Sequence, residues 1–336
     1  MARIGIIGAG AYGTALACVM RRSGNNVVIW AREREVTAAL NRDAENPLFL
    51  KGVPLPPGII ATNDLSEAAT AEVLLLAPPA QHMRAVTTQL RPHLADGKVV
   101  VTCSKGIERG TCALMSQVIA ETLPRARIAV LSGPSFATDI AIDLPAGVTL
   151  ACTDLALAER LAHVIGTPRF RTYLSDDVIG AHVGGVLKNV IAIACGVALG
   201  RKLGDSARAT LIARGLAEAA QLGVAMGARF ETFLGLSGAG DFVLSCNSPR
   251  SRNMSLGMAL GEGRKLPDIL AERTTVQEGV HSAESVAVLA RRHKLDMPIA
   301  LAVDAVLNHG AGVDESIDEL LLHSRGMELP LQRVGA

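Results

Sequence analysis

The 336-residue sequence predicts an α/β protein: an N-terminal, doubly wound, mainly parallel, Rossmann-like sheet domain followed by an all-helical domain. A strand signal at 3–7 runs directly into the glycine pattern 8–13 and then into a helical pattern. Further strand signals alternate with helices up to about residue 177, and long helical segments rich in Ala, Leu and Gly follow. We expect residues 1–180 to bind a dinucleotide and residues 181–336 to form a substrate-binding domain.

The first strand, turn and helix have the pattern of a dinucleotide-binding unit. In this interpretation Gly8 allows the tight turn, Gly10 lets the backbone approach the pyrophosphate, and Gly13 lets the helix pack closely on the strand. The N-terminus of the helix would then face the phosphates. The alternative is a glycine-rich turn without a ligand. The clean strand before the glycines and the clean helix after them favour the dinucleotide site.

The end of the second predicted strand, 27–30, bears on the choice of cofactor. An acidic residue about 20 positions past the glycines would hold the ribose hydroxyls of NAD. Here Arg32 lies closest to that position, and an arginine suits the 2′-phosphate of NADP. The next residue, Glu33, is acidic, so NAD stays an alternative to NADP. A second alternative is that this segment is a solvated charged turn. We predict NADP, with NAD as the alternative.

The remaining elements of the first half follow the same rhythm of strands and helices. We predict strands at 73–77, 99–102, 128–131, 148–152 and 170–174, and helices at 81–94 and 111–123. Lys105 and the turn 132–137 each come just after a strand. Ligands of such sheets gather at the carboxyl ends of the strands, so both are candidates for the substrate site. On position alone, an ordinary loop lysine is the better interpretation of Lys105.

The second half places a lysine inside an apolar helix. Predicted helices cover 179–199, 206–226, 253–262, 282–293 and 299–307. Lys188 lies in the apolar stretch 184–194 of the first of them, near the junction of the two domains. Desolvation would lower its pKa and make the amine a usable acid or base. Alternatively, its stem follows the helix and its ammonium stays in water. This stretch alone leaves both interpretations open.

Two predicted loops of the second half concentrate polar groups. Residues 236–242 form a glycine-rich turn that presents one acid, Asp241. Residues 245–253 offer hydroxyls, guanidinium groups and amides just before a helix. Arginine together with helix N-terminal amides is a common way to hold a phosphate monoester. A surface turn with a helix cap is the alternative for the second loop.

Composition and charge exclude several classes of protein. A net charge of +1 and an aromatic content of 3% give no basis for binding nucleic acid. We expect no export signal and no integral membrane segment, because the longest apolar runs, such as 190–199, are too short to cross a bilayer. Six cysteines without metal-ligand spacing are predicted to be buried thiols in a reducing compartment, with no metal site. We therefore predict a cytoplasmic protein.

Seven motifs occur in order along the chain and together resemble a known family. They are Gly8–Ala15, Ser104–Gly106, Ser132–Ala137, Lys188–Val190, Gly240–Asp241, Ser251–Asn253 and Glu278–Gly279. The set resembles the bacterial NAD(P)-dependent sn-glycerol-3-phosphate dehydrogenases over essentially the whole chain. This resemblance implies a cytosolic enzyme that interconverts dihydroxyacetone phosphate and sn-glycerol 3-phosphate, which supplies the backbone of phospholipids. The chain departs from the family pattern at 78–80 and Gln277, near the cofactor, so cofactor preference is affected most.

The same resemblance implies roles for individual residues. Lys188 would be the catalytic group, with Lys105 and Asp241 beside it. Positions that match cofactor contacts are Gly8, Gly10, Ala11, Tyr12, Gly13, Arg32, Lys105, Ala137, Arg252, Val276 and Glu278. Positions that match substrate contacts are Lys105, Gly133, Ser135, Lys188, Asp241, Ser251, Arg252 and Asn253.

Reduction of a ketone leaves negative charge on oxygen, which needs a proton or a positive charge nearby. No histidine has a motif that suggests this role, so Lys188 is the candidate, either as proton donor or as a source of charge. The first rival is a related reductase of a 3-hydroxy acid or a ketopantoate-like substrate. The second is a catalytically silent NADP-binding regulator. We also predict a homodimer from the apolar helical half.

Overall fold

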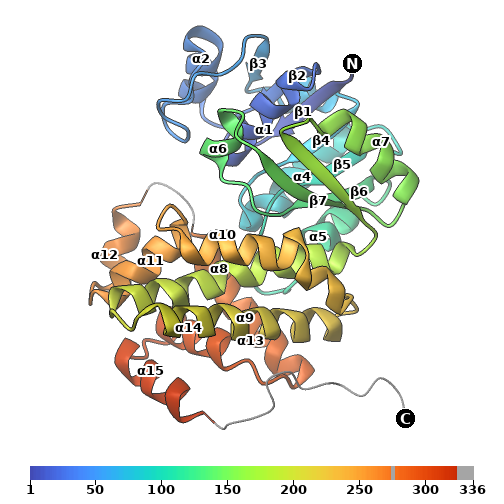
Figure 1. Ribbon diagram of the computed structural model, residues 1–336. Helices are drawn as coiled ribbons and strands as arrows, with labels where there is room; N and C mark the ends of the chain where they lie inside the picture. The colour runs from blue at the N-terminus through green and yellow to red at the C-terminus, as the bar shows by residue number, and fades with distance from the viewer. Residues whose placement is uncertain (274–276, 324–336) are drawn as a thin grey trace, which may run out of the picture.

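The computed structural model describes residues 1–273 and 277–323 and divides them between a sheet-containing part and a helical part (Figure 1). Eight strands form one sheet in the order β3-β2-β1-β4-β5-β6-β7-β8. All neighbouring strands are parallel except β6 and β7, so the sheet is mainly parallel as predicted. The strands are β1 (Arg3–Ile7), β2 (Asn26–Trp30), β3 (Ile59–Thr62), β4 (Val73–Leu76), β5 (Val99–Thr102), β6 (Arg127–Ser132), β7 (Ala146–Ala151) and β8 (Phe170–Ser175).

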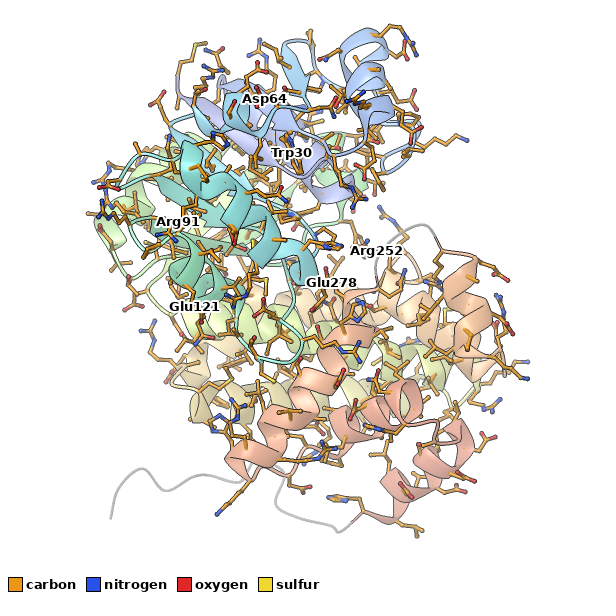
Figure 2. All side chains as sticks on the ribbon, turned by 180° about the vertical axis from the view of Figure 1, so that it is seen from behind. Trp30, Asp64, Arg91, Glu121, Arg252 and Glu278 are labelled. Atoms are coloured by element: carbon orange, nitrogen blue, oxygen red, sulfur yellow. The ribbon has the colours of Figure 1, made fainter. Side chains whose placement is uncertain are left out.

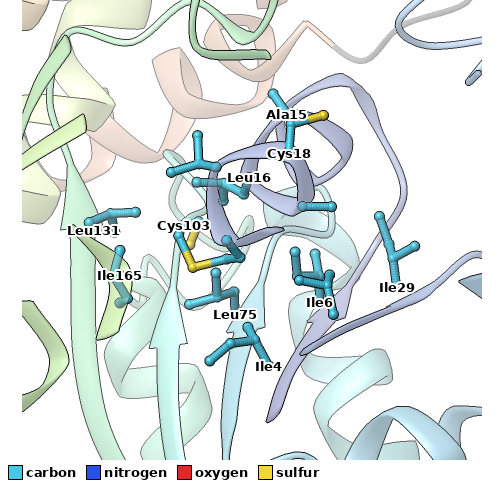
Figure 3. Close-up of a cluster of buried hydrophobic side chains, with 14 of the residues drawn as sticks. Ile4, Ile6, Ala15, Leu16, Cys18, Ile29, Leu75, Cys103, Leu131 and Ile165 are labelled. Atoms are coloured by element: carbon cyan, nitrogen blue, oxygen red, sulfur yellow. The ribbon is translucent and has the colours of Figure 1, made fainter. Parts of the chain in front are cut away.

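The sheet separates two hydrophobic cores because side chains alternate between its faces. On β1, Ile4 and Ile6 join one core and Ile7 joins the other. Figure 3 shows the first core, where Leu16 of α1 (Ala11–Arg22) packs with Ile6 and with Leu75 of β4. Burial on both faces explains why β1 and β4 are apolar almost throughout.

Short helices cover the two faces of the sheet and connect its strands (Figure 1). They are α2 (Arg34–Asp43), α3 (Leu65–Ala69), α4 (Met83–Leu90), α5 (Met115–Thr122), α6 (Ala137–Ala141) and α7 (Leu155–Ile165). The single helix predicted at 81–94 is wrong in its extent. Only α4 is α-helical there, and 3-10 turns lie on either side, the second of them at Arg91–His93, which contains Pro92. The helix predicted from residue 111 begins only at Met115.

All described elements after β8 are helical. They are α8 (Val178–Gly200), α9 (Asp205–Ala225), α10 (Asp241–Asn247), α11 (Arg252–Gly261), α12 (Leu266–Ala271), α13 (Glu278–His293), α14 (Pro298–Asn308) and α15 (Val313–Leu322). Two 3-10 or π turns, Phe230–Leu234 and Leu236–Gly240, connect α9 to α10. The glycine-rich loop predicted at 236–242 is therefore wrong. It is a helical turn, and Asp241 is the first residue of α10.

Helix α8 is the centre of the helical part, and α11 packs against it unusually closely. A Cβ atom on Gly196 would lie 2.1 Å from the carbonyl oxygen of Met254, and one on Gly257 would lie 2.0 Å from that of Ile193. The two backbones can approach this closely only because both positions are glycine. This contact fixes α11, which begins at Arg252, against the helix that carries Lys188.

Length alone does not exclude α8 as a membrane span. Its 23 residues are long and apolar enough to cross a bilayer, so the argument from short apolar runs is wrong for this helix. However, 72% of its most apolar window is buried inside the protein, and neighbouring helices surround it (Figure 1). It is therefore placed as the core helix of the helical part. All six cysteines are also buried with free thiols, as predicted.

Candidate active site

The glycine turn after β1 leaves room for an anion at the N-terminus of α1. Gly8 has a φ of +109°, which L side chains rarely adopt, and a Cβ on Gly13 would lie 1.9 Å from the carbonyl oxygen of Gly8. Gly10 precedes Ala11, the first residue of α1, and no side chain caps the helix there. A Cβ on Gly10 would meet nothing within 4 Å. Open space and uncapped N–H groups are what a pyrophosphate needs at this position.

Three charged side chains from three distant segments meet at the junction of the two parts. Lys105, in the loop after β5, donates from Nζ to Asp241 Oδ2 and to the carbonyl oxygen of Gly133, each at 2.6 Å. Lys188 Nζ lies 3.3 Å from Asp241 Oδ1 and donates to Ser245 Oγ at 2.9 Å. One carboxylate therefore bridges two ammonium groups.

Burial sets the protonation of this cluster. The Lys188 side chain is only 13% exposed, so its ammonium does not extend into water. Desolvation lowers the pKa of Lys188 to about 8, and the nearby Asp241 carboxylate limits that fall. Burial alone would raise the pKa of Asp241, but the charges and hydrogen bonds of Lys105 and Lys188 outweigh it and hold the pKa below its usual value. The cluster contains an amine that can titrate near neutral pH.

The loop after β6 joins this cluster to α1. Ser135 donates from Oγ to the carbonyl oxygen of Gly133 at 3.1 Å, so the hydroxyl of Tyr12 donates to Ser135 Oγ at 2.9 Å. Lys105 Nζ lies 6.0 Å from the centre of the Tyr12 ring. Ala137 begins α6 directly after this loop. The structure therefore brings together cofactor and substrate candidates that lie more than 90 residues apart.

The N-terminus of α11 forms the other side of the candidate site. Ser251 caps this helix, its Oγ accepting from the N–H of Met254 at 3.4 Å. Arg252 is exposed, whereas Asn253 is buried. The amide of Asn253 donates to Asn189 Oδ1 at 2.8 Å and accepts from the N–H of Gly279 at 3.2 Å. These bonds hold the Asn253 side chain against α8 and α13, and we expect Asn253 to offer a ligand its backbone N–H in the first turn of α11.

The roles of two residues at the site did not follow from the sequence. Ser245 accepts from Lys188, and it lies one helical turn after Asp241 in α10. Asn189 donates to the carbonyl oxygen of Lys105 at 3.0 Å and so connects the Lys105 loop to α8. The sequence indicated a loop around Asp241, so the one-turn spacing that would have revealed Ser245 went unused. Asn189 directly follows Lys188, but nothing local shows where its side chain ends.

The remaining cofactor candidates differ in their surroundings. Glu278 accepts from the N–H of Ala80 at 3.0 Å, and its buried Oε2 has no hydrogen-bond partner among the described residues. Figure 2 shows Glu278 and Arg252 at the junction between the two parts. Arg32 is 75% exposed and donates to Glu33 Oε1 from Nε at 3.0 Å and from Nη2 at 2.7 Å. Val276 lies outside the described residues.

Residues 3–158 match the family model of the NAD-dependent glycerol-3-phosphate dehydrogenase N-terminus, and residues 177–318 match that of the C-terminus. The chain belongs to the NAD-dependent glycerol-3-phosphate dehydrogenase family. It is 56% identical over 319 residues to the glycerol-3-phosphate dehydrogenase [NAD(P)+] of Parvibaculum lavamentivorans, covering 95% of this chain and 96% of that protein. The enzyme of the same name from Caulobacter vibrioides is 52% identical with the same coverage.

Solved structures agree with this family assignment. The crystal structure of glycerol-3-phosphate dehydrogenase from Coxiella burnetii has a TM-score of 0.91 and 35% identity, covering 95% of this chain and 98% of that one. A ketopantoate reductase from Ralstonia eutropha has a TM-score of 0.60 at 15% identity, which shows a shared fold and nothing more. The predicted fold class and family are both confirmed.

Proposed function

We propose that the protein is an NAD(P)H-dependent reductase of dihydroxyacetone phosphate that forms sn-glycerol 3-phosphate, reversibly, for glycerophospholipid synthesis. The observation that carries the proposal is the buried cluster of Lys105, Asp241 and Lys188. On one side of the cluster, Lys105 Nζ lies 6.0 Å from the ring centre of Tyr12 in the first turn of α1. On the other side Asn189, next to Lys188, accepts from Asn253 in the first turn of α11. The names of the curated relatives support the same activity.

The residues of the cluster match the needs of ketone reduction. A bound nicotinamide cofactor would supply the hydride. Lys188, protonated below a pKa of about 8, would place a positive charge and a transferable proton at the substrate oxygen, where negative charge develops. Asp241 would hold both ammonium groups in place and limit the positive charge of the site.

A phosphate would bind at the start of α11. The backbone N–H groups of Arg252 and Asn253 lie in the first turn of that helix, where anions are stabilised. Arg252 is an exposed residue, and its guanidinium can add a bidentate contact. Holding the phosphate fixes the carbonyl carbon of the same small molecule near the cluster, which removes much of the entropic cost of reaction.

A substrate panel tests the activity. We expect oxidation of NADPH with dihydroxyacetone phosphate, and little with ketopantoate or with the keto form of a 3-hydroxy acid. The rival substrates carry carboxylates and have no group for a phosphate site. Preferred turnover of either rival would refute the proposal, and single-turnover oxidation of NADPH that fails with all three would support the silent regulator.

We further infer a preference for NADP, a homodimer, a cytoplasmic location and a domain boundary near residue 180. The exposed Arg32 directly after β2 supports the cofactor preference. Exposed apolar side chains on the helical part, such as Leu234 at 64% and Val243 at 56%, support self-association. The six buried free thiols support a reducing compartment. Sedimentation analysis would test the dimer.

A further inference from the structure

An arginine next to the predicted phosphate site connects the helical part to the sheet part. Arg250 precedes the cap of α11, and its Nη2 donates to Asp139 Oδ1 and to Thr138 Oγ1, each at 2.5 Å. Nη1 donates to Asp139 Oδ2 at 3.3 Å. The guanidinium also lies over the ring of Phe136, 4.8 Å from its centre. One side chain thus makes four contacts with the start of α6.

Both ends of this contact adjoin the candidate active site. On the helical side, Arg250 is followed by Ser251, the cap of α11. On the sheet side, Phe136 follows the loop that contains Gly133 and Ser135. A displacement of Arg250 would therefore move the phosphate ligands relative to the loop that holds Lys105.

Helix α6 is itself held from its opposite end. Arg22, in the last turn of α1, donates to the carbonyl oxygen of Ile140 at 3.1 Å and to that of Ala141. Helix α6 also packs along α1 (Figure 1). The contacts of Arg250 therefore connect α11 through α6 to the helix that faces the dinucleotide site. Asp139 lies in the first turn of α6, where an acid is favoured by the helix dipole.

We propose that Arg250 is a positioning residue. Arg250, Asp139 and Phe136 together are called the latch below. The latch holds the N-terminus of α11 at the distance from Lys105 and the 133–135 loop of the sheet part that a phosphorylated ketone must span. This inference rests on the proposed function. An isolated exposed ion pair contributes little to stability. Arg250, however, combines a bidentate contact to Asp139 with a cation–π contact to Phe136, and together these contacts define a single geometry. The latch therefore affects binding of the substrate phosphate and not the transfer of the hydride or the proton.

The chain offers a matched control for a contact between the two parts. Arg109, in the loop after β5, donates to Glu284 of α13 at 2.5 Å. The Arg109 and Glu284 side chains are 55% and 36% exposed, against 53% and 28% for Arg250 and Asp139. Replacing Arg109 removes an ion pair of similar exposure that does not adjoin α11.

The test compares Arg250→Ala, Arg250→Lys, Asp139→Asn and the double variant Arg250→Ala/Asp139→Asn with Arg109→Ala. We expect the KM for dihydroxyacetone phosphate to rise about tenfold in Arg250→Ala, less in Arg250→Lys, and not at all in Arg109→Ala. Turnover of dihydroxyacetone, which has no phosphate, should stay within about twofold of wild type, and the double variant should be no worse than Arg250→Ala. Thermal unfolding verifies that each variant is folded.

Three results would overturn the latch: an unchanged KM, an equal loss with dihydroxyacetone, or additive effects in the double variant. Amide hydrogen exchange of residues 249–255 tests the latch independently of activity. Exchange there should be faster in Arg250→Ala and unchanged in Arg109→Ala, and equal rates in all proteins would also overturn it. If the wild type does not reduce dihydroxyacetone phosphate, the proposed function fails while the exchange result still decides on the latch.

Discussion

Replacing Asp241 by asparagine tests whether its charge sets the protonation of Lys188. The substitution preserves the shape of the side chain and removes the negative charge that lies 3.3 Å from Lys188 Nζ. Without that charge, burial and the neighbouring Lys105 both act to lower the pKa of Lys188 further. The variant should therefore need a lower pH to keep Lys188 protonated.

The magnitude follows from the geometry. At 3.3 Å and an effective dielectric constant of about 20, the attraction amounts to about 5 kcal/mol. Rearrangement of Lys105 and entry of water would reduce this to about half, which moves the pKa of Lys188 from about 8 to about 6. At pH 7.5 the protonated fraction then falls about 25-fold, and at pH 6 it falls only about twofold.

The assay is the pH dependence of kcat/KM for reduction of dihydroxyacetone phosphate, from pH 6 to pH 9. The ratio of the values at pH 6 and pH 7.5 cancels losses that do not depend on pH, and the wild type corrects for ionisation of the substrate. Lys188→Ala is the control, because its kcat should fall about 100-fold and its pH profile of kcat/KM should show no decrease near pH 8. If the Asp241→Asn profile falls at the same pH as that of the wild type, the carboxylate does not set the charge of Lys188.

Three further substitutions test other parts of the site and fold. Arg252→Lys should raise the KM for dihydroxyacetone phosphate about tenfold, because the bidentate contact is lost; an unchanged KM would place the phosphate elsewhere. Arg32→Ala should raise the KM for NADPH about tenfold and leave that for NADH unchanged; a wild type that prefers NADH would refute the predicted preference. Glu218 is buried and accepts from the N–H groups of Ile299 and Ala300 at 2.8 and 3.0 Å, and burial raises its pKa from 4.5 to about 7. Its carboxyl therefore contributes stability at low pH that is lost as the pH rises through 7. Urea unfolding of Glu218→Ala should show a loss of about 2–4 kcal/mol that is larger at pH 5 than at pH 8; a loss independent of pH would contradict this pKa.

Much of the sheet part could be predicted because its determinants are local. Gly8 and Gly13 are needed by steric contacts within one turn, so their spacing alone indicates the strand, the turn and the helix. The order of seven short motifs was enough to predict the family. The helical nature of 236–242 was not predictable, since its glycines favour a loop and the turn packs against α8, β7 and the 230–234 turn, which lie far away or carry no local signal in the sequence.

By itself the sequence determined the fold class, the dinucleotide turn, the family and the identity of the candidate catalytic lysine. Only the tertiary structure decided the state of that lysine. The pKa of Lys188 depends on burial and on Asp241, 53 positions along the chain, and the Lys105–Asp241 bond joins residues 136 positions apart. The Arg250 latch joins residues 111 positions apart in two different parts of the protein. Electrostatic energy depends on distance and dielectric surroundings, and both are defined only once the two parts have packed together.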